Sequence, residues 1–476
     1  MGSNKNKYNE LKVVYDDLRN HLSHLLHGSV HIESLNIHYD LPPEAISYHH
    51  WVNRLLIFVG ALALGGAAVG FAALCELAYE QFLVLRAFDP TWIFVLTPTG
   101  LLLLRYVSEK FFPEAAGSGV PQVIASLNKM KNAGPQLLGL RAAFGKVVGT
   151  MGGLACGASI GREGPTVQIG AIILRSVFKR LKTPAVYTER SLILAGGAAG
   201  VSAAFNTPIA GIVFAIEELG KAFYEKETSV LLMAIVVSGL LALSFSGPYH
   251  YFGETAAVIS ASGKLWAIPV GLLCGVSGGV FSRLLIKGTK LIKQTSFKTQ
   301  MQLTFLFGVG IAVIGFLSQG QTFGSGYIET RDLFKGTTAD GYFPLAKSLA
   351  TLLSYWCGIP GGLFSPSLAI GASIGSVFSA FFQPAFQQAF VLFGMVGFLS
   401  GVIRSPITSV IIVAEMTNNH NLIFSLLLCA VASYGGSILV IKDSLYHSLA
   451  KLQYDGEIKS PVSGPGSGIG PSPGSI

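Results

Sequence analysis

The feature that most constrains this fold is a charge-free apolar segment that runs from Leu55 to Cys75. A helix of this length can cross about 30 Å of hydrocarbon. Further apolar blocks follow at residues 91–104, 229–249, 265–282, 303–317, 345–357, 389–403 and 422–441. Only 12% of the residues are charged, about half the share that is usual in soluble domains. The blocks predict an all-α polytopic membrane protein, because a membrane barrel would show alternating polar and apolar residues instead.

The two ends of the chain differ from this apolar middle. Residues 1–50 are polar, hold most of the ten histidines and show no cleavable signal peptide, so we expect a solvated cytoplasmic arm. Residues 456–476 are rich in Gly, Ser and Pro, which predicts a disordered tail. Between them we expect two transmembrane repeats, at residues 51–252 and 263–455.

The cysteines and histidines predict neither a disulfide framework nor a metal site. The five cysteines are scattered in apolar sequence without paired spacing, which favours small buried hydrophobic side chains. His21, His24 and His27 fall on one helical stripe, but a solvated arm is favoured over metal binding.

The net charge of +8 is best explained by membrane topology. Basic residues gather in short polar segments at Lys179–Lys182 and Lys287–Lys298. Such segments usually stay in the cytoplasm. We expect the lipid bilayer, and no nucleic acid, as the partner of this charge.

The two halves of the chain resemble each other. Asn206–Glu218, "NTPIAGIVFAIEE", aligns with Arg404–Met416, "RSPITSVIIVAEM". Upstream, Gly164–Ala171, "GPTVQIGA", aligns with Ser365–Ala372, "SPSLAIGA". Paired segments that Gly and Pro interrupt in two halves of a membrane protein indicate a transport site at the interface of the repeats.

Three Gly/Pro motifs, "GSGVPQ", "GREGP" and "GGLFSP", are typical of helices that begin inside the membrane. Each has a proline that suits a first helical turn: Pro121, Pro165 and Pro366. A helix N-terminus carries about half a positive charge and unpaired N–H groups, so it attracts an anion without a full cation. Conduction needs weak binding of this kind. Ser118 can add a hydroxyl donor, and the N–H groups of Leu363 and Phe364 can point at the same ion.

Glu163 lies two residues before Pro165, where a carboxylate meets the same positive field. It can occupy an anion site when no anion is bound and leave when protonated, which would make it both a gate and a proton carrier. Ionisable residues inside a membrane are usually functional. The alternatives are a helix cap or an ion pair with Arg162, whose own role stays open.

Glu217 and Glu218 end the helix that begins near Pro208. For both residues the alternative is an interfacial carboxylate at a helix end. Glu217 has a repeat partner in Glu415, which favours a structural role. Glu218 has no such partner and is the better candidate for an unshared task.

In their order and repeat arrangement, the three motifs resemble those of the CLC chloride channels and proton-coupled chloride exchangers. The resemblance runs from Trp51 to about Leu452 and is closest to prokaryotic exchangers without cytoplasmic CBS domains. It implies two inverted-topology repeats of short, tilted, broken helices. It also implies a homodimer with one pathway per subunit, both termini in the cytoplasm, and a prokaryotic inner (plasma) membrane.

The resemblance also implies the site residues. Glu163 matches the external gating glutamate, and Glu218 matches the internal proton-transfer glutamate of exchangers. The implied anion-binding residues are Ser118, Gly164, Leu363, Phe364 and Tyr446. One departure concerns Gln122, which stands where the usual motif has glutamate and puts the local charge of that helix start in doubt.

The expected function is therefore a secondary antiporter that exchanges chloride for protons, without a cofactor or an enzymatic reaction. A ratio of two chlorides per proton is implied by the resemblance alone. A passive chloride-selective channel of the same fold is the alternative, and the acid at Glu218 favours exchange. An intramembrane hydrolase is disfavoured: "GASIG" at Gly157–Gly161 and Gly371–Gly375 lacks a strand–turn–helix context, and His250, His420 and His447 lie outside the apolar core segments.

Overall fold

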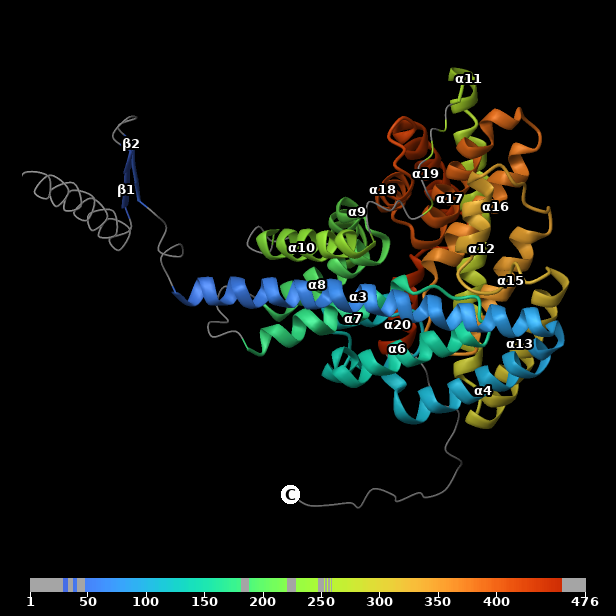
Figure 1. Ribbon diagram of the computed structural model, residues 1–476, viewed down its shortest axis with the longest axis horizontal. Helices are drawn as coiled ribbons and strands as arrows, with labels where there is room; N and C mark the ends of the chain where they lie inside the picture. Colours follow the sequence, from blue (N-terminus) through green and yellow to red (C-terminus); the bar gives the residue numbers. More distant parts are fainter. Residues whose placement is uncertain are drawn as a thin grey trace, which may run out of the picture.

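The computed structural model describes residues 29–32, 37–40, 48–180, 188–220, 228–246, 252, 255, 257 and 259–455. These residues are almost entirely helical (Figure 1), apart from an antiparallel hairpin of two short strands, β1 (Ser29–Ile32) and β2 (Ile37–Asp40). Most of the predicted N-terminal arm, with His21, His24 and His27, lies outside the described residues, as do the predicted tail and part of the Lys179–Lys182 cluster. The boundaries expected for the two repeats stay a prediction.

The first half of the chain forms α3 (Tyr48–Phe88), α4 (Ile93–Phe111), α5 (Val120–Leu127), α6 (Leu140–Ala155), α7 (Glu163–Phe178), α8 (Glu189–Phe205), α9 (Pro208–Phe214), the π-helix η4 (Ala215–Leu219) and α10 (Thr228–Ser246). The second half forms α11 (Ala261–Lys264), α12 (Ala267–Lys293), α13 (Phe297–Leu317), α14 (Tyr327–Phe334), α15 (Phe343–Trp356), α16 (Phe364–Ser379), α17 (Gln387–Ile403), α18 (Pro406–Thr417), α19 (Ile423–Ile438) and α20 (Leu445–Tyr454). Short 3₁₀ turns occur at η1 (Pro90–Trp92), η2 (Pro113–Ala115), η3 (Pro135–Leu138) and η6 (Pro384–Phe386).

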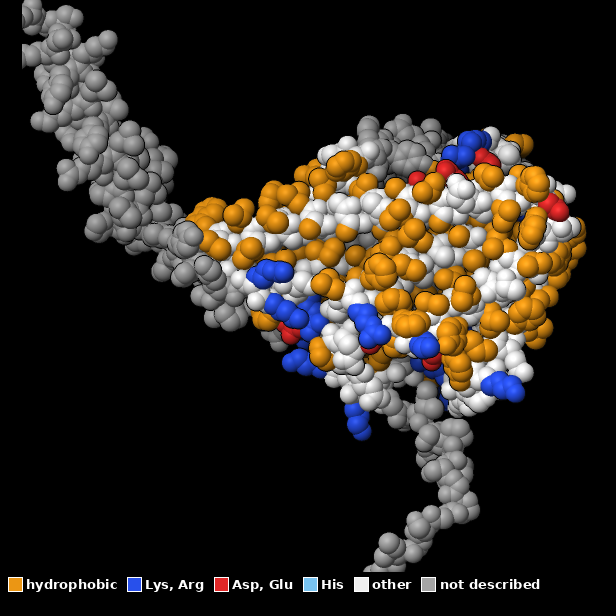
Figure 2. Space-filling view, turned by 60° about the horizontal axis from the view of Figure 1, so that its bottom comes forward, with side chains coloured by type: hydrophobic (Ala, Val, Ile, Leu, Met, Phe, Trp, Pro, Cys, Tyr) orange, Lys and Arg blue, Asp and Glu red, His pale blue; other side chains and the backbone are white. Residues whose placement is uncertain are grey.

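Five helical segments among the described residues are long and apolar enough to cross a membrane. They are Trp51–Phe88, Pro90–Phe111, Ala267–Lys293, Phe297–Leu317 and Pro384–Ile403. At 1.5 Å per residue, the 41 residues of α3 would extend about 60 Å. That length exceeds the hydrocarbon thickness, so α3 must tilt or project. Figure 2 shows hydrophobic side chains across the middle of one face, with most of the visible Lys and Arg near the lower edge.

Helices α7 to α10 and α16 to α19 pack in the same way within the two halves of the chain. Gly170 of α7 lies against Gly196 of α8, and Gly371 of α16 lies against Gly394 of α17. A Cβ atom on any of these glycines would overlap the backbone of the facing helix, so close helix packing requires glycine at both crossings. Gly170 and Gly371 are equivalent in the alignment of the two halves, which confirms the internal repeat in three dimensions.

The repeats also cap each other. Glu217, in η4, accepts hydrogen bonds of 3.2 and 2.7 Å from two backbone N–H groups in the first turn of α18. Glu415, near the end of α18, accepts bonds of 3.2 and 2.7 Å from two N–H groups in the first turn of α9. Each repeat thus makes the same contact with the other, as expected for two units related by a two-fold axis. The pairing explains why a glutamate occurs at this position in both halves.

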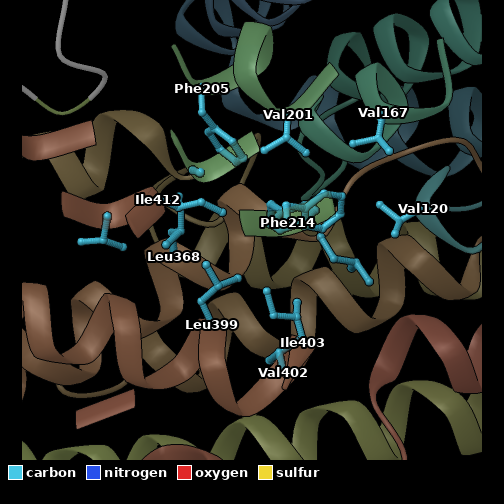
Figure 3. Close-up of a cluster of buried hydrophobic side chains, with 14 of the residues drawn as sticks. Val120, Val167, Val201, Phe205, Phe214, Leu368, Leu399, Val402, Ile403 and Ile412 are labelled. Carbon is cyan, nitrogen blue, oxygen red and sulfur yellow. The ribbon is translucent and has the colours of Figure 1, made fainter. Parts of the chain in front are cut away.

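The largest hydrophobic cluster lies between the two repeats. Figure 3 shows its centre, where side chains from both halves interleave. The labelled members come from α5 and α7 to α9 on one side and from α16 to α18 on the other: Val120, Val167, Val201, Phe205, Phe214, Leu368, Leu399, Val402, Ile403 and Ile412. This cluster fixes the starts of the broken helices relative to one another.

We predict that the reciprocal caps stabilise the fold. Glu217→Ala and Glu415→Ala should each lower the free energy of unfolding by about 1–2 kcal/mol, because helix N–H groups lose a charged acceptor. Glu217→Gln and Glu415→Gln keep an acceptor oxygen, so their free energies of unfolding should lie between those of the alanine variants and that of the unsubstituted protein. Thermal unfolding of the detergent-solubilised proteins measures this order of stability. Alanine variants that melt with the unsubstituted protein would contradict the capping role.

Candidate functional site

Three glycine-rich loops meet where α5, α7 and α16 begin. Gly161 and Gly362 exchange two backbone hydrogen bonds, with N···O distances of 2.9 and 2.7 Å. Gly117 donates to the carbonyl of Ile359 at 3.3 Å and accepts from the N–H of Gly361 at 3.2 Å. These bonds join the motifs "GSGVPQ", "GREGP" and "GGLFSP", so three helices from both repeats start within one small region.

Ser118 and Gly164 touch at the centre of this region. Ser118 is fully buried, and a Cβ atom on Gly164 would lie 2.5 Å from Ser118 Oγ and 2.7 Å from Ser118 O. Gly119 has a φ of +106°, which only glycine adopts readily. A Cβ there would also lie 2.5 Å from the carbonyl oxygen of Gly164. The absence of side chains at these glycines lets the serine hydroxyl reach the start of α7.

Glu163 is the first residue of α7 and is fully buried. Its Oε1 accepts a hydrogen bond of 2.6 Å from Ser365 Oγ, in the first turn of α16. A Cβ atom on Gly161 would collide with the other carboxylate oxygen, so the carboxylate lies in space that this glycine leaves open. The structure therefore places Glu163 between the starts of two equivalent helices, one from each repeat.

Leu363 and Phe364 lie at the start of α16, as predicted. Leu363 is the N-cap and Phe364 is the first helical residue, so their N–H groups precede the intrahelical ladder. The Phe364 ring packs against Phe205, Phe214 and Tyr446, with ring centroids 5.8, 5.9 and 5.6 Å away. This packing fixes the position at which α16 begins.

Tyr446 reaches the same region from the other end of the chain. It lies in α20 and is fully buried. Its ring packs against Phe364 at the start of α16, and the charges of Glu163 and Glu218 act on its hydroxyl. The structure thus brings together all five predicted anion-binding residues and places both predicted proton-carrying glutamates around them.

Glu218 lies on the π-turn that ends the α9 segment, and its side chain is 3% exposed. Ser405 Oγ donates to Glu218 Oε2 at 2.8 Å, and His447 Nδ1 lies 3.5 Å from Glu218 Oε1. Adjacent Glu217 turns away to cap α18. A π-turn, which is frequent at functional sites, therefore gives two consecutive glutamates different surroundings.

The departure at Gln122 has a local explanation. Gln122 Oε1 accepts from the N–H of Gly119 at 3.1 Å, and its Nε2 donates to the carbonyl of Ala116 at 2.5 Å. The amide oxygen caps the start of α5, and the amide nitrogen donates to a backbone carbonyl. An ionised glutamate at this position could accept the first bond but could not donate the second. Gln122 therefore shapes the loop that carries Ser118 without adding charge to it.

A cavity of about 340 Å³ lies beside Glu163 and is lined by charged residues that include Glu76, Glu80, Arg162 and Glu329. Arg162 Nη1 pairs with Glu76 at 2.8 Å and donates to the carbonyl of Ala72 at 2.9 Å. Arg162 is thus held against α3 on the wall of this cavity, and Glu163 is the buried residue among the charged ones that line it.

Sequence reasoning missed several residues around the site. Ser365 and Ser405 donate to the two candidate proton carriers, although Ser365 lies beside Pro366 and Ser405 lies within the repeated segment Arg404–Met416. Lys146 is fully buried in α6 and donates to the carbonyl of Gly117 at 2.9 Å; a lysine inside an apolar helix was the signal. His447 was placed outside the core segments, but α20 brings it to Glu218.

The two "GASIG" stretches do not form hydrolase elbows. Ser159 lies between α6 and α7 and shares a hydrogen bond of 2.9 Å with Thr351 Oγ1. Ser373 lies within α16 and donates to the carbonyl of Ile370 at 2.7 Å. Among the described residues, no group of three or more His, Cys, Asp or Glu side chains has a metal-binding arrangement.

Comparison with known proteins places these observations in a family. The profile of the voltage gated chloride channel family matches residues 100–437. The chain therefore belongs to this family. It is 30% identical over 437 residues to the H(+)/Cl(-) exchange transporter ClcA of Citrobacter koseri, with 86% of each chain covered. It is 29% identical over 394 residues to the ClcA transporter of Salmonella gallinarum, covering 77% of this chain and 81% of that protein.

Solved structures share the fold. A slow cyanobacterial Cl⁻/H⁺ antiporter superposes with a TM-score of 0.74 at 22% identity, covering 88% of this chain and 99% of the other. A CLC-type fluoride/proton antiporter gives a TM-score of 0.70 at 22% identity, covering 84% and 98% of the two chains. A eukaryotic CLC transporter gives 0.69 at 22% identity, covering 84% and 74%. These similarities confirm the predicted all-α architecture of short, broken membrane helices.

We predict that Gly164→Ala disrupts the site without unfolding the protein. The added methyl would press on Ser118 at 2.5–2.7 Å, closer than ordinary van der Waals contact, so chloride binding measured by calorimetry should weaken by at least about tenfold. Gly70→Ala is the matched control, because a Cβ atom there meets nothing within 4 Å. Equal chloride affinity in both variants would contradict the arrangement of Ser118 and Gly164.

Proposed function

We propose that the protein is a secondary active antiporter that exchanges chloride for protons across a membrane. The observation that carries the proposal is Glu163, a fully buried carboxylate at the junction of two helix N-termini. Helix N-termini attract anions, so an anionic side chain there stands where a transported anion would bind. The names of the ClcA relatives, which are H⁺/Cl⁻ exchange transporters, support the choice of substrates.

Chloride would bind where the three glycine-rich loops meet. The hydroxyls of Ser118 and Tyr446 and the N–H groups of Gly164, Leu363 and Phe364 would donate to it. These are dipolar donors without a full cation, and such donors hold an anion weakly enough to release it. Their convergence at the starts of α5, α7, α16 and α20 supports a single central site.

Glu163 would act as the gate and as the outer proton carrier. When ionised, it competes with chloride for the starts of α7 and α16; when protonated, it loses its attraction to them and leaves. The cavity beside Glu163 gives it a route toward one side of the membrane. One carboxylate would thereby link the entry of a proton to the release of an anion site.

Glu218 would serve as the inner proton carrier. It is buried and accepts from Ser405, and its repeat equivalent is Met416, so no symmetric structural role explains its charge. The charges of both glutamates act on the Tyr446 hydroxyl, so both proposed proton carriers lie near the proposed anion site. The energy would come from ion gradients alone, without a cofactor or an enzymatic reaction, and the ratio would be two chlorides per proton.

We place both termini on the cytoplasmic face. Leu56 to Ala63, in the first half of α3, line a surface pocket with Arg175, Lys179 and Arg180 at or just after the end of α7. The end of α20 lines another with Arg105 and Lys293. Both ends of the described membrane domain therefore lie near basic residues, as the positive-inside rule requires of a cytoplasmic face. Bacterial relatives support a prokaryotic inner membrane.

We also propose a homodimer with one pathway in each subunit. The first turns of α9 and α18 expose Ile209 and Ile407, at 55% and 51%. Beside them lie the partly exposed carboxylates of Glu217 and Glu415. Carboxylates that face lipid are costly, so a second subunit that covers this face would remove the cost.

The exchange proposal predicts how two substitutions change coupling. Glu163→Gln mimics the protonated gate and should keep chloride flux while abolishing proton movement driven by a chloride gradient. Glu218→Gln should also retain chloride flux and lose proton coupling, because the inner carrier can no longer ionise. Paired chloride and proton flux measurements in liposomes test both variants.

Glu189→Gln is the control for this experiment, because Glu189 pairs with Arg175 at the surface and should stay coupled. Chloride flux without uphill proton movement in the unsubstituted protein would favour the passive channel. Retained coupling in Glu163→Gln would contradict its role as the gate.

The dimer proposal predicts that Ile407→Trp shifts the protein toward monomers, because the larger side chain cannot fit a closely packed interface. Leu103→Trp adds the same bulk at an exposed position of α4 and should leave the oligomeric state unchanged. Single-molecule photobleaching in liposomes at decreasing protein density measures both. A monomeric unsubstituted protein would refute the dimer.

A further inference from the structure

His447 of α20 lies beside the inner glutamate. Its Nδ1 is 3.5 Å from Glu218 Oε1, and the side chains are 18% and 3% exposed respectively. Among the described residues, Glu218 is the only carboxylate within 4.0 Å of this imidazole. A partly exposed titratable ring therefore stands next to a buried acid that has little contact of its own with solvent.

The hydrogen bonds around the pair orient both groups. Ser405 Oγ donates to Glu218 Oε2 at 2.8 Å, which leaves Oε1 as the oxygen that faces His447. Ser444 Oγ lies 3.0 Å from His447 Nδ1, so the hydroxyl and the carboxylate share one edge of the ring. The other ring nitrogen, Nε2, lies on the opposite edge of the imidazole. One ring nitrogen thus faces the buried acid and the other lies away from it, which is the arrangement that a proton relay needs.

Several other charged groups near α20 are bonded elsewhere. Asp443 pairs with Lys451 at 3.4 Å, and Arg404 donates to the carbonyls of Ile441 and Lys442. Glu217 is bonded to the first turn of α18. Of the helices that pack on α20, α5 and α17 carry no ionisable side chain, whereas α12 carries four basic residues: Arg283, Lys287, Lys290 and Lys293.

We propose that His447 relays protons between the cytoplasmic solution and Glu218. Imidazole is the side chain whose charge ordinarily changes between pH 5 and 8, so it can both gain and lose a proton under physiological conditions. The proposal rests on the exchange function above, and it adds a residue that receives the proton before Glu218 does.

The transfer balances with one proton moved. A neutral ring with its hydrogen on Nδ1 takes a proton from water on Nε2 and becomes imidazolium. The Nδ1 proton then passes to Glu218 Oε1, which leaves a neutral carboxylic acid and a neutral ring protonated on Nε2. Proton exchange between that ring and water restores the first tautomer, and the steps run in reverse when protons leave.

The position of His447 also links the two substrates. Tyr446 precedes it and is fully buried beside Ser118 and Phe364, whereas His447 is partly exposed beside Glu218. The first turn of α20 thus presents one side chain to the anion site and the next to the proton route. Neighbouring residues on a helix point in different directions, which allows this division without a second element.

The test is the proton flux of His447→Gln in liposomes, measured against the pH of the solution on the cytoplasmic side. Glutamine keeps hydrogen bonding but cannot carry a proton. We expect chloride flux to persist and coupled proton flux to fall by about tenfold or more near neutral pH. Imidazole added on the cytoplasmic side of His447→Ala should restore the proton flux, which a purely structural histidine would not permit.

His420→Gln is the matched control, because His420 is exposed in the loop after α18 and should leave proton flux unchanged. Wild-type proton flux in His447→Gln across about pH 5.5–8 would overturn the relay, and so would a loss that imidazole does not restore. Glu218→Gln separates the two proposals. If it uncouples protons while His447→Gln does not, only the relay fails; if it stays coupled, the exchange mechanism fails.

Discussion

The reciprocal hydrogen bonds between Gly161 and Gly362 are the interaction on which the rest of the site depends. A helix that starts inside a membrane exposes backbone groups that hydrocarbon cannot satisfy. Here each broken segment supplies partners for the other, so the chain can leave helical geometry at membrane depth. The same bonds bring the starts of α7 and α16 together, and this places two helix N-termini around one buried carboxylate.

In the proposed mechanism, the carboxylates that carry protons lie where the two repeats differ, and those that cap helices lie where the repeats agree. Glu217 and Glu415 are equivalent, and each caps the helix of the other repeat. Glu163 and Glu218 have no acidic equivalents, because Phe364 and Met416 occupy the corresponding positions. In the proposed mechanism, the two equivalent helix starts attract the anion, and the two carboxylates without equivalents carry the proton.

Glycine serves two physical purposes in this chain. At Gly170, Gly196, Gly371 and Gly394 it lets helices pack with their backbones in contact. At Gly164 it leaves room for the hydroxyl of Ser118. The helix-destabilising effect of so many glycines is offset by tertiary contacts that larger residues would prevent.

The sequence by itself determined the membrane class, the internal repeat and the positions of the broken helices, because apolar length, Gly/Pro interruptions and repeated spacing are local properties of the chain. The same pattern and the family resemblance singled out Glu163, Glu218 and the anion-binding residues. Only the tertiary structure decided that Ser365 bonds to Glu163 and that His447 lies beside Glu218. Those contacts join residues more than 200 positions apart, and no local pattern specifies which side chain faces which across a packed interface.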